Sequence, residues 1–284
     1  MPIELTHIAE IRELLSRHGF TFSKKLGQNF LVNPSVCPRM ADACGADKQS
    51  GVLEIGPGIG VLTRELSRVA GKVVAVELDA RLPALLKETL ADCDNVTIVS
   101  GDVMQLDLAA LLKEHFPPDM PVAVCANLPY YITSPILMKL LESRLPFTSL
   151  TVMVQKEAAV RLCAQPGTRE CGAVTLAVRY YAEPQILFPV SRGSFLPAPN
   201  VDSAVIRLDI RPQPPCAVKD EAVLFRLIRA AFGQRRKTLL NALSGGGFAK
   251  EAVAAALAKI DLSPAARAEE LSLNQFAALA DALS

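Results

Sequence analysis

The sequence lacks paired cysteines. Its 284 residues include seven cysteines, an odd number at scattered positions, and no two of them form a C-x-x-C pair. A disulfide framework needs paired cysteines, and a structural zinc site needs clustered ones. The pattern therefore argues against both and is typical of a protein from a reducing compartment. We expect no bound metal ion.

We expect neither a signal peptide nor a membrane span. The N-terminus carries Glu4, Glu10 and Glu13 and has no apolar stretch that could serve as a signal peptide. The longest uncharged run, 120–138, is long enough to cross a membrane, but it contains three prolines and Asn127. We predict a strand, a loop and the start of a helix there, and a cytoplasmic protein without a membrane partner.

Neither sign of charge is in excess. Thirty Lys and Arg residues balance 29 Asp and Glu residues, which gives a net charge of +1. Such a balance can hide a basic face, so nucleic-acid binding has to be argued from local clusters. Residues 225–241 contain five basic residues and no acidic one, at Arg226, Arg229, Arg235, Arg236 and Lys237. On one helix these would form a cationic face suited to RNA phosphates, although such a cluster is more often a solvated surface.

Apolar runs alternate with segments of helical spacing in the middle of the chain, and they lie at 52–55, 73–76, 96–99, 122–125 and 150–154. Residues 3–17 also have helical spacing. The alternation is typical of a parallel sheet with crossover helices, and therefore of an α/β fold.

The pattern changes after about residue 173. Strand-like segments follow one another with too little room for crossover helices, at 174–181, 185–189 and 203–210. We therefore expect at least one antiparallel strand at this side of the sheet. The proline-rich stretch 211–215 predicts a stiff linker, and 219–284 predicts a helical region.

A glycine-rich turn follows the first predicted strand. Its glycines have the spacing G-x-G-x-G, whereas a dinucleotide fingerprint needs G-x-G-x-x-G. Val61 stands where the third glycine of that fingerprint would be. With the acidic Glu54 before it, the turn suits a smaller adenosyl ligand that has no pyrophosphate. A tight strand–helix turn without a ligand is the alternative.

Polar residues follow the next three strands. Glu77 lies at the end of the second strand, where an acid can accept hydrogen bonds from both ribose hydroxyls. Asp102 follows the third strand and could accept a bond from an adenine amine. The fourth strand leads into residues 127–130, Asn-Leu-Pro-Tyr. Each could be a solvated strand end or an ordinary turn, but in this order they indicate one ligand site.

Seven segments together resemble the rRNA adenine N6,N6-dimethyltransferases, in particular the bacterial small-subunit group, in family order: 25–31, 54–58, 76–79, 101–102, 127–130, 154–157 and 232–238. Each segment alone is weak, whereas the ordered set is highly specific. The related large-subunit enzymes, which confer macrolide resistance, share the cofactor motifs. Residues 234–238 and Leu128 favour the small-subunit group.

The resemblance implies a class I S-adenosylmethionine-dependent methyltransferase, with a Rossmann-like, mainly parallel seven-stranded sheet. Residues 1–211 would form the catalytic domain, with 1–35 as an N-terminal flap, and 212–284 a small all-helical RNA-binding domain. S-Adenosylmethionine would be the methyl donor. Its expected contacts, mapped residue by residue, are Asn29, Leu31, Gly56, Gly58, Glu77, Asp102 and Asn127.

The resemblance places the chemistry at residues 127–130. The side-chain oxygen of Asn127 and the backbone carbonyl of Leu128 would accept both N6–H bonds of the target adenine. Pro129 would fix the turn, and Tyr130 would stack on the extruded base. We expect no general base, because positioning and charge stabilisation can be sufficient.

Further residues are expected to contact the substrate. Phe195 lies in a proline-rich loop that the resemblance places beside the target base, where it would stack on the base or pack between the sheet and the C-terminal domain. Lys24 and Lys25 would extend the basic surface. The expected partner is small-subunit (16S) rRNA within a 30S precursor particle, and the protein is expected to be a monomer.

The implied activity is dimethylation of N6 on two adjacent adenosines near the 3′ end of that rRNA. One alternative is a large-subunit enzyme. A second is a non-catalytic RNA-binding or transcription accessory protein of the same fold, and a third is a methyltransferase for a metabolite or a protein amide. A pyrimidine C5 enzyme is rejected, because its nucleophilic cysteine would have to be Cys216 in the linker or Cys125 within a strand.

Overall fold

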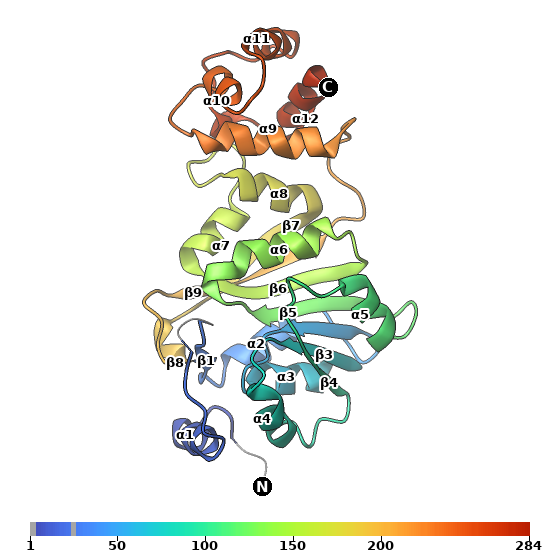
Figure 1. Cartoon of the computed structure of the whole chain (residues 1–284), viewed down its shortest axis with the longest axis vertical. Coiled ribbons are helices and arrows are strands. Elements are labelled where there is room, and N and C mark those ends of the chain that lie inside the picture. Colours follow the sequence, from blue (N-terminus) through green and yellow to red (C-terminus); the bar gives the residue numbers. More distant parts are fainter. Residues whose placement is uncertain (1–3, 24–26) are drawn as a thin grey trace. The chain divides into compact units, whose positions relative to one another are not determined.

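The computed structural model describes residues 4–23 and 27–284 (Figure 1). Contacts divide the chain into two compact units: residues 1–159 with 185–210, and residues 160–184 with 211–284. Residues 160–184, expected in the catalytic domain, thus group with the helical region. The functional assignment of the two parts remains a prediction.

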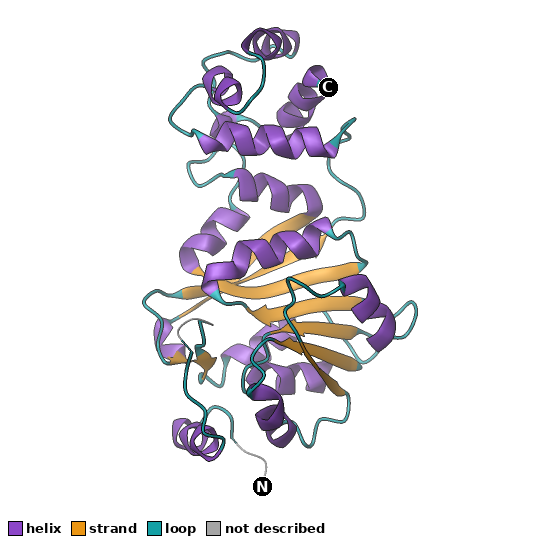
Figure 2. Ribbon diagram, in the orientation of Figure 1, coloured by secondary structure: helices purple, strands orange, loops and turns teal. Residues whose placement is uncertain are grey.

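A seven-stranded sheet with the order β4-β3-β2-β5-β6-β9-β7 forms the centre of the first unit (Figure 2). The strands are β2 (Gly51–Ile55), β3 (Lys72–Glu77), β4 (Val96–Ser100), β5 (Val122–Asn127), β6 (Phe147–Gln155), β7 (Ala182–Val190) and β9 (Ser203–Ile210). Strands β4, β3, β2, β5 and β6 pair in parallel, and β9 pairs antiparallel with β6. The predicted mainly parallel sheet with an antiparallel strand at this side is confirmed.

The continuous apolar runs of the sequence become the central strands. All five residues of β2 are buried, and in β5 every residue before Asn127 is buried. Because successive side chains of a strand point to opposite faces, the sheet is covered on both sides at these strands. The helices that begin in this unit are α1 (Ile8–Arg17), α2 (Val36–Ala43), α3 (Val61–Val69), α4 (Leu82–Thr89), α5 (Leu108–His115), α6 (Thr133–Glu142) and α7 (Lys156–Cys163).

The N-terminal region packs against α4 and the edge strand β4. Helix α1 buries Ile11, Leu14 and Leu15 in one cluster with apolar residues of α4, as its helical spacing predicted. The short strand β1 (Phe30–Leu31) pairs antiparallel with β8 (Phe195–Leu196), and this two-stranded sheet is separate from the main one. The pairing of β1 with β8 and the packing of Leu31 in one cluster with Val52 and Val73 place the segment 27–33 beside the main sheet.

Helices make up most of the second unit: α8 (Ala173–Tyr181), α9 (Glu221–Gly233), α10 (Leu239–Gly245), α11 (Lys250–Lys259) and α12 (Leu273–Leu283). The helical region predicted over 219–284 is confirmed. The strand predicted over 174–181 is wrong, because these residues form α8. The segment is rich in valine and tyrosine, which favour strands, but its rings pack on α9, where Tyr180 and Tyr181 contact Phe225.

Within the two described stretches of the chain, none of the helices is both long and apolar enough to cross a membrane.

Candidate active site

The carboxyl ends of four parallel strands meet at one edge of the sheet. The register pairs Ile55 on β2 with Val76 on β3 and with Ala126 on β5, and Glu77 on β3 with Ser100 on β4. The loops after these strands therefore lie side by side, and a pocket opens among them. Ten residues predicted from the sequence line it: Asn29, Leu31, Gly56, Gly58, Glu77, Asp102, Asn127, Leu128, Pro129 and Tyr130.

The glycine loop after β2 has a backbone that only glycine adopts easily. Gly56 and Gly58 have φ values of 70° and 61°, in the left-handed region. A Cβ on Gly56 would meet nothing within 4 Å, so the wall here is open backbone. A Cβ on Gly58 would lie 3.2 Å from the ring of Phe30, so this glycine also makes room for the N-terminal segment.

Glu77 ends β3 with its carboxylate held toward the glycine loop. Its side chain accepts hydrogen bonds from the backbone N–H of Asp79 at 2.8 Å and of Gly58 at 3.3 Å. Burial raises the pKa of Glu77, and these two backbone bonds lower it in smaller measure. The carboxylate is thus fixed in position at the pocket wall, where it can accept bonds from ligand hydroxyls.

A second acid, Glu54, is fully buried at the same wall. Burial raises the pKa of Glu54 to about 8; the Thr63 hydroxyl beside it offsets part of the rise, and the Glu77 carboxylate adds to it. Among the described residues, Oε2 of Glu54 and the Thr63 hydroxyl have no hydrogen-bond partner of standard geometry. A buried carboxyl oxygen without a partner can receive a hydrogen-bond donor or a cation that a ligand brings.

Asp102 occupies the loop after β4, and a lysine from another helix holds that loop. Oδ1 of Asp102 accepts the N–H of Met104 at 2.8 Å. The Lys139 ammonium, from α6, donates to the backbone carbonyls of Met104 and Leu106, both at 2.9 Å. These bonds give the Asp102 carboxylate a defined place at the pocket.

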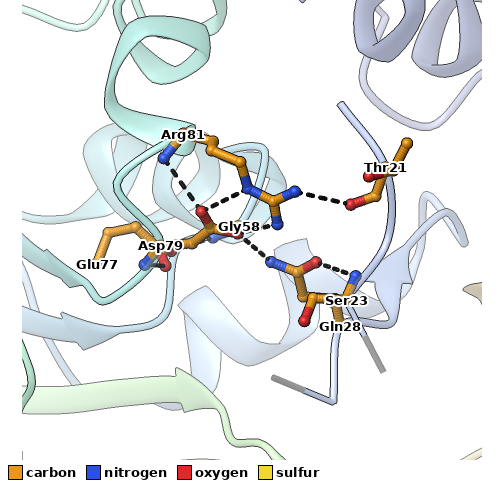
Figure 3. A network of polar contacts seen from close by, with 7 residues as sticks. All are labelled: Thr21, Ser23, Gln28, Gly58, Glu77, Asp79 and Arg81. Atoms are coloured by element: carbon orange, nitrogen blue, oxygen red, sulfur yellow. Dashed lines mark hydrogen bonds and ion pairs between the residues drawn. The ribbon is translucent and has the colours of Figure 1, made fainter. Parts of the chain in front are cut away.

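A polar network ties the N-terminal segment to the loop after β3 (Figure 3). The Gln28 side chain donates to Asp79 at 2.7 Å and accepts the backbone N–H of Ser23 at 2.8 Å. Arg81 pairs with the same Asp79 carboxylate at 2.6 Å and donates to the Thr21 carbonyl at 3.1 Å. Hydrogen bonds from the Arg81 side chain, ahead of other causes, lower the pKa of Asp79 to about 2.

These hydrogen bonds hold the segment 27–31 against the pocket. Asp79 is also the residue whose N–H holds Glu77, so one loop joins the predicted ribose site to the predicted flap.

Asn127 ends β5 with its amide between the sheet and the N-terminal segment. Its Nδ2 faces the Asn29 carbonyl at 3.5 Å, a long contact that does not involve the acceptor Oδ1, and Asn127 lines the pocket. The next residue, Leu128, donates its N–H to the Met153 carbonyl on β6 at 3.3 Å. The backbone that presents both predicted acceptors is therefore anchored in the sheet.

The aromatic side chain of Tyr130 is held from the opposite side. Its hydroxyl shares a 2.6 Å hydrogen bond with the Ser203 hydroxyl on β9, and its ring is half-buried. Tyr130 begins a short 3₁₀ helix (Tyr130–Ile132) that leads into α6, and the Thr133 hydroxyl there donates to the Pro129 carbonyl at 3.1 Å. The turn is thus bonded at both of its ends.

A model of the family described as "Ribosomal RNA adenine dimethylase" matches residues 19–284. The chain belongs to this family. A protein from Geobacillus thermodenitrificans (strain NG80-2) named "Ribosomal RNA small subunit methyltransferase A" is 49% identical over 276 residues, which cover 96% of this chain and 94% of the relative. A protein of the same name from Streptococcus pneumoniae (strain P1031) is 48% identical, with 96% and 95% covered.

Two solved structures of methyltransferases share the fold. The 23S rRNA methyltransferase ErmE superposes with a TM-score of 0.68 at 27% identity, over 90% of this chain and 99% of that one. A dimethyladenosine transferase from Plasmodium falciparum gives a TM-score of 0.73 at 26% identity, over 88% and 95%. The predicted class I methyltransferase fold is therefore confirmed.

Phe195 lies behind the pocket wall, because it pairs in register with Leu31, which lines the pocket. It belongs to β8, is 4% exposed, and packs in a cluster with Leu31 and Val190 of the first unit. It is not among the residues that line the pocket. This placement does not support the expected stacking on the target base. The alternative, a packing role, agrees with its burial, although its neighbours here belong to the first unit.

The predicted RNA-binding residues are exposed but do not share one helix. Arg226 and Arg229 lie on α9, whereas 235–237 lie in the turn before α10. Arg235 donates to the carbonyls of Arg169 at 2.6 Å and Cys171 at 3.1 Å, so its guanidinium also has a structural role. Lys24 and Lys25 lie outside the described residues.

Sequence reasoning missed the residues that position this site. Gln28 and Asp79 occur in the segments that carried the resemblance, but nothing in the local pattern connected them. Lys139 gave no signal, because its two acceptors are backbone carbonyls more than 30 residues away. In the part of the chain that the structure describes, no group of three or more His, Cys, Asp or Glu could hold a metal ion.

Proposed function

We propose that this protein transfers two methyl groups from S-adenosylmethionine to N6 of each of two adjacent adenosines near the 3′ end of small-subunit rRNA. Membership of the rRNA adenine dimethylase family supports the reaction. The small-subunit choice is supported by the identity of 48–49% to relatives named for the small subunit, against 27% to a 23S rRNA enzyme. The large-subunit alternative has no comparable support.

The residues of the pocket fit S-adenosylmethionine. Glu77 would accept the ribose hydroxyls, and Asp102 would accept the exocyclic amine of its adenine. The open backbone at Gly56 leaves space beside them. The buried carboxyl of Glu54, which has an oxygen without a partner, suits a ligand that brings positive charge or a donor group. When bound, the cofactor supplies an electrophilic methyl group on a sulfonium.

The proposed chemistry depends on the position of Asn127, which ends β5 at the pocket and precedes a residue bonded to β6. The N6 lone pair of adenine is delocalised into the ring, so the amine is a poor nucleophile until its hydrogens are held out of the ring plane. Oδ1 of Asn127 and the carbonyl of Leu128 would accept those two N–H bonds. Because the Leu128 N–H is anchored to β6, neither acceptor needs to reorganise as charge develops on N6.

Residues 128–130 would hold the target base without taking its proton. Pro129, with φ of −59°, fixes the turn, and Tyr130 offers a ring kept in place by its bond to Ser203. Residues 127–130 include no carboxylate, thiol or imidazole. After methyl transfer N6 carries positive charge and is acidic, so it would lose its proton to water.

The finer points of the proposal concern partners. We place the activity in the cytoplasm, on a 30S precursor particle, with the protein acting as a monomer. The exposed basic residues of α9 and of the turn after it are suited to rRNA phosphates.

One experiment tests the proposal. The protein is incubated with labelled S-adenosylmethionine and small ribosomal subunits that lack adenine methylation, and the label is mapped on the rRNA. We expect label on two adjacent adenosines near the 3′ end, as N6,N6-dimethyladenosine. Intact large subunits serve as the control substrate. Label on large-subunit rRNA, or none on either, would refute the proposal.

A further inference from the structure

An unusually exposed aromatic residue lies at the rim of the pocket. Tyr131 follows the four-residue turn directly and is 60% exposed, and it lines the pocket together with Tyr130. Of the large hydrophobic side chains that are exposed in the described residues, it has the highest exposed fraction. Because Tyr131 also lines the pocket, its exposed ring is available to a ligand that extends beyond the pocket.

Local structure holds this ring at the rim. The 3₁₀ helix (Tyr130–Ile132) fixes its backbone between the Tyr130–Ser203 bond and the start of α6. One side of the ring lies against the N-terminal segment, since a Cβ added to Gly27 would be 3.4 Å from Cδ1 and Cε1 of Tyr131. Gly27 has a φ of 62°, which favours glycine, and most of Tyr131 is open to solvent.

We propose that Tyr131 stacks on the base of the nucleotide next to the target adenosine, an inference that rests on the proposed function. A base that enters the pocket leaves its neighbour without a stacking partner, and this exposed face is unfavourable in water. Proteins recover such losses with aromatic side chains, which accept any base because every base has a flat π-face. Tyr131 lies one residue from Tyr130, so one ring serves the target base and the next ring serves its neighbour.

With the proposed substrate, Tyr131 would contact a neighbouring base during the methylation of each of the two adenosines. With two adjacent adenosines, each is the target in one step and the neighbour in another. A ring at the rim that tolerates any base can stack on an unmodified adenine or on a dimethylated one. Tyr131 would then act in both steps, through RNA affinity and not through the cofactor.

Three variants separate stacking from packing. Tyr131→Phe keeps the ring and loses only the hydroxyl. Tyr131→Leu keeps an apolar side chain against Gly27 but removes the π-face, and Ile186→Ser removes a 43% exposed apolar side chain of β7 that does not line the pocket. Melting temperatures show whether each variant is folded.

The assay uses undermethylated small subunits and measures kcat, the KM for subunits, and the cofactor Kd by calorimetry. We expect Tyr131→Leu to raise KM on the order of tenfold, with kcat within about threefold and the cofactor Kd unchanged. Tyr131→Phe and Ile186→Ser should behave as the wild type. As a second readout, 2-aminopurine beside the target in a model RNA hairpin should be quenched by the wild type and Tyr131→Phe but not by Tyr131→Leu.

Different outcomes refute different statements. An unchanged KM and unchanged quenching in Tyr131→Leu overturn the stacking inference while the wild type still methylates small subunits. A weaker cofactor Kd in Tyr131→Leu also overturns it, because the ring would then act through the N-terminal segment. If the wild type methylates no small-subunit adenosine, the proposed function fails and this inference fails with it.

Discussion

Replacing Glu54 by glutamine should stabilise the protein without its cofactor, and the gain should depend on pH. Glu54 is fully buried, its Oε2 has no partner among the described residues, and its pKa is raised from 4.5 to about 8. An acid whose folded pKa lies above its unfolded pKa stays protonated in the folded chain while it ionises in the unfolded chain. Stability is therefore lost as the pH rises from about 4.5 to about 8.

The size of the effect follows from that window. Each pKa unit corresponds to about 1.36 kcal/mol. A pH of 7 lies about 2.5 units above the unfolded pKa of 4.5, so the loss of folding free energy there is at most about 3 kcal/mol. At pH 4 the loss is close to zero. Glutamine has nearly the same shape and does not ionise. Glu54→Gln should thus unfold with a free energy higher by about 2–3 kcal/mol at pH 7 and nearly equal to the wild type at pH 4.

The measurement is urea unfolding at pH 4 and pH 7, followed by circular dichroism because the chain has no tryptophan. Glu114→Gln is the matched control, since the Glu114 side chain is 74% exposed and its 3.9 Å contact with His115 is a weak surface pair, so its replacement should change little at either pH. A Glu54→Gln protein that is less stable than the wild type at pH 7, or that shows the same difference at both pH values, would refute the reasoning.

Three further predictions concern the site and the basic surface. Gln28→Ala removes two hydrogen bonds that hold the N-terminal segment and should weaken cofactor binding by about 5- to 20-fold in calorimetry. Gln275→Ala, which removes the bonds of a glutamine in the cap of α12, should leave that affinity unchanged; equal losses in both variants would point to general destabilisation. Asn127→Ala should slow single-turnover methyl transfer by roughly 10²- to 10³-fold, and a near-normal rate would contradict the acceptor role. Neutralising Arg229 and Arg236 to glutamine should reduce the slope of log affinity for RNA against log salt by about one for each residue, whereas an unaltered slope would mean that both are simply solvated.

Most of the architecture could be predicted from local pattern. The central strands are buried on both faces, so their sequences are continuous apolar runs, and this signal does not depend on distant residues. Residues 174–181 defeated the same reasoning. Their valines and tyrosines have strand propensity, but Gly172 and Thr175 form a cap at the start of α8, and contacts with α9 bury the rings, so tertiary packing outweighed propensity.

The residues of the pocket were predictable because parallel strands end at the same edge of a sheet. Once Gly56, Glu77, Asp102 and Asn127 were placed at successive strand ends, their meeting followed from topology. The positions of Asn29 and Leu31 came from family resemblance alone, since nothing local predicts that this segment lies at the pocket.

The sequence by itself determined the α/β class, the order of the strand ends and the residue types that face the pocket, because each depends on the identity and spacing of neighbours in the chain. Only the tertiary structure decided how those residues are held. Gln28 donates to Asp79, 51 positions further along the chain, and Lys139 on α6 donates to two backbone carbonyls in the loop of Asp102. It also decided that Phe195 is buried while Tyr131 stays exposed. Such contacts join residues that are far apart in the sequence and have no regular spacing, so no local pattern predicts them.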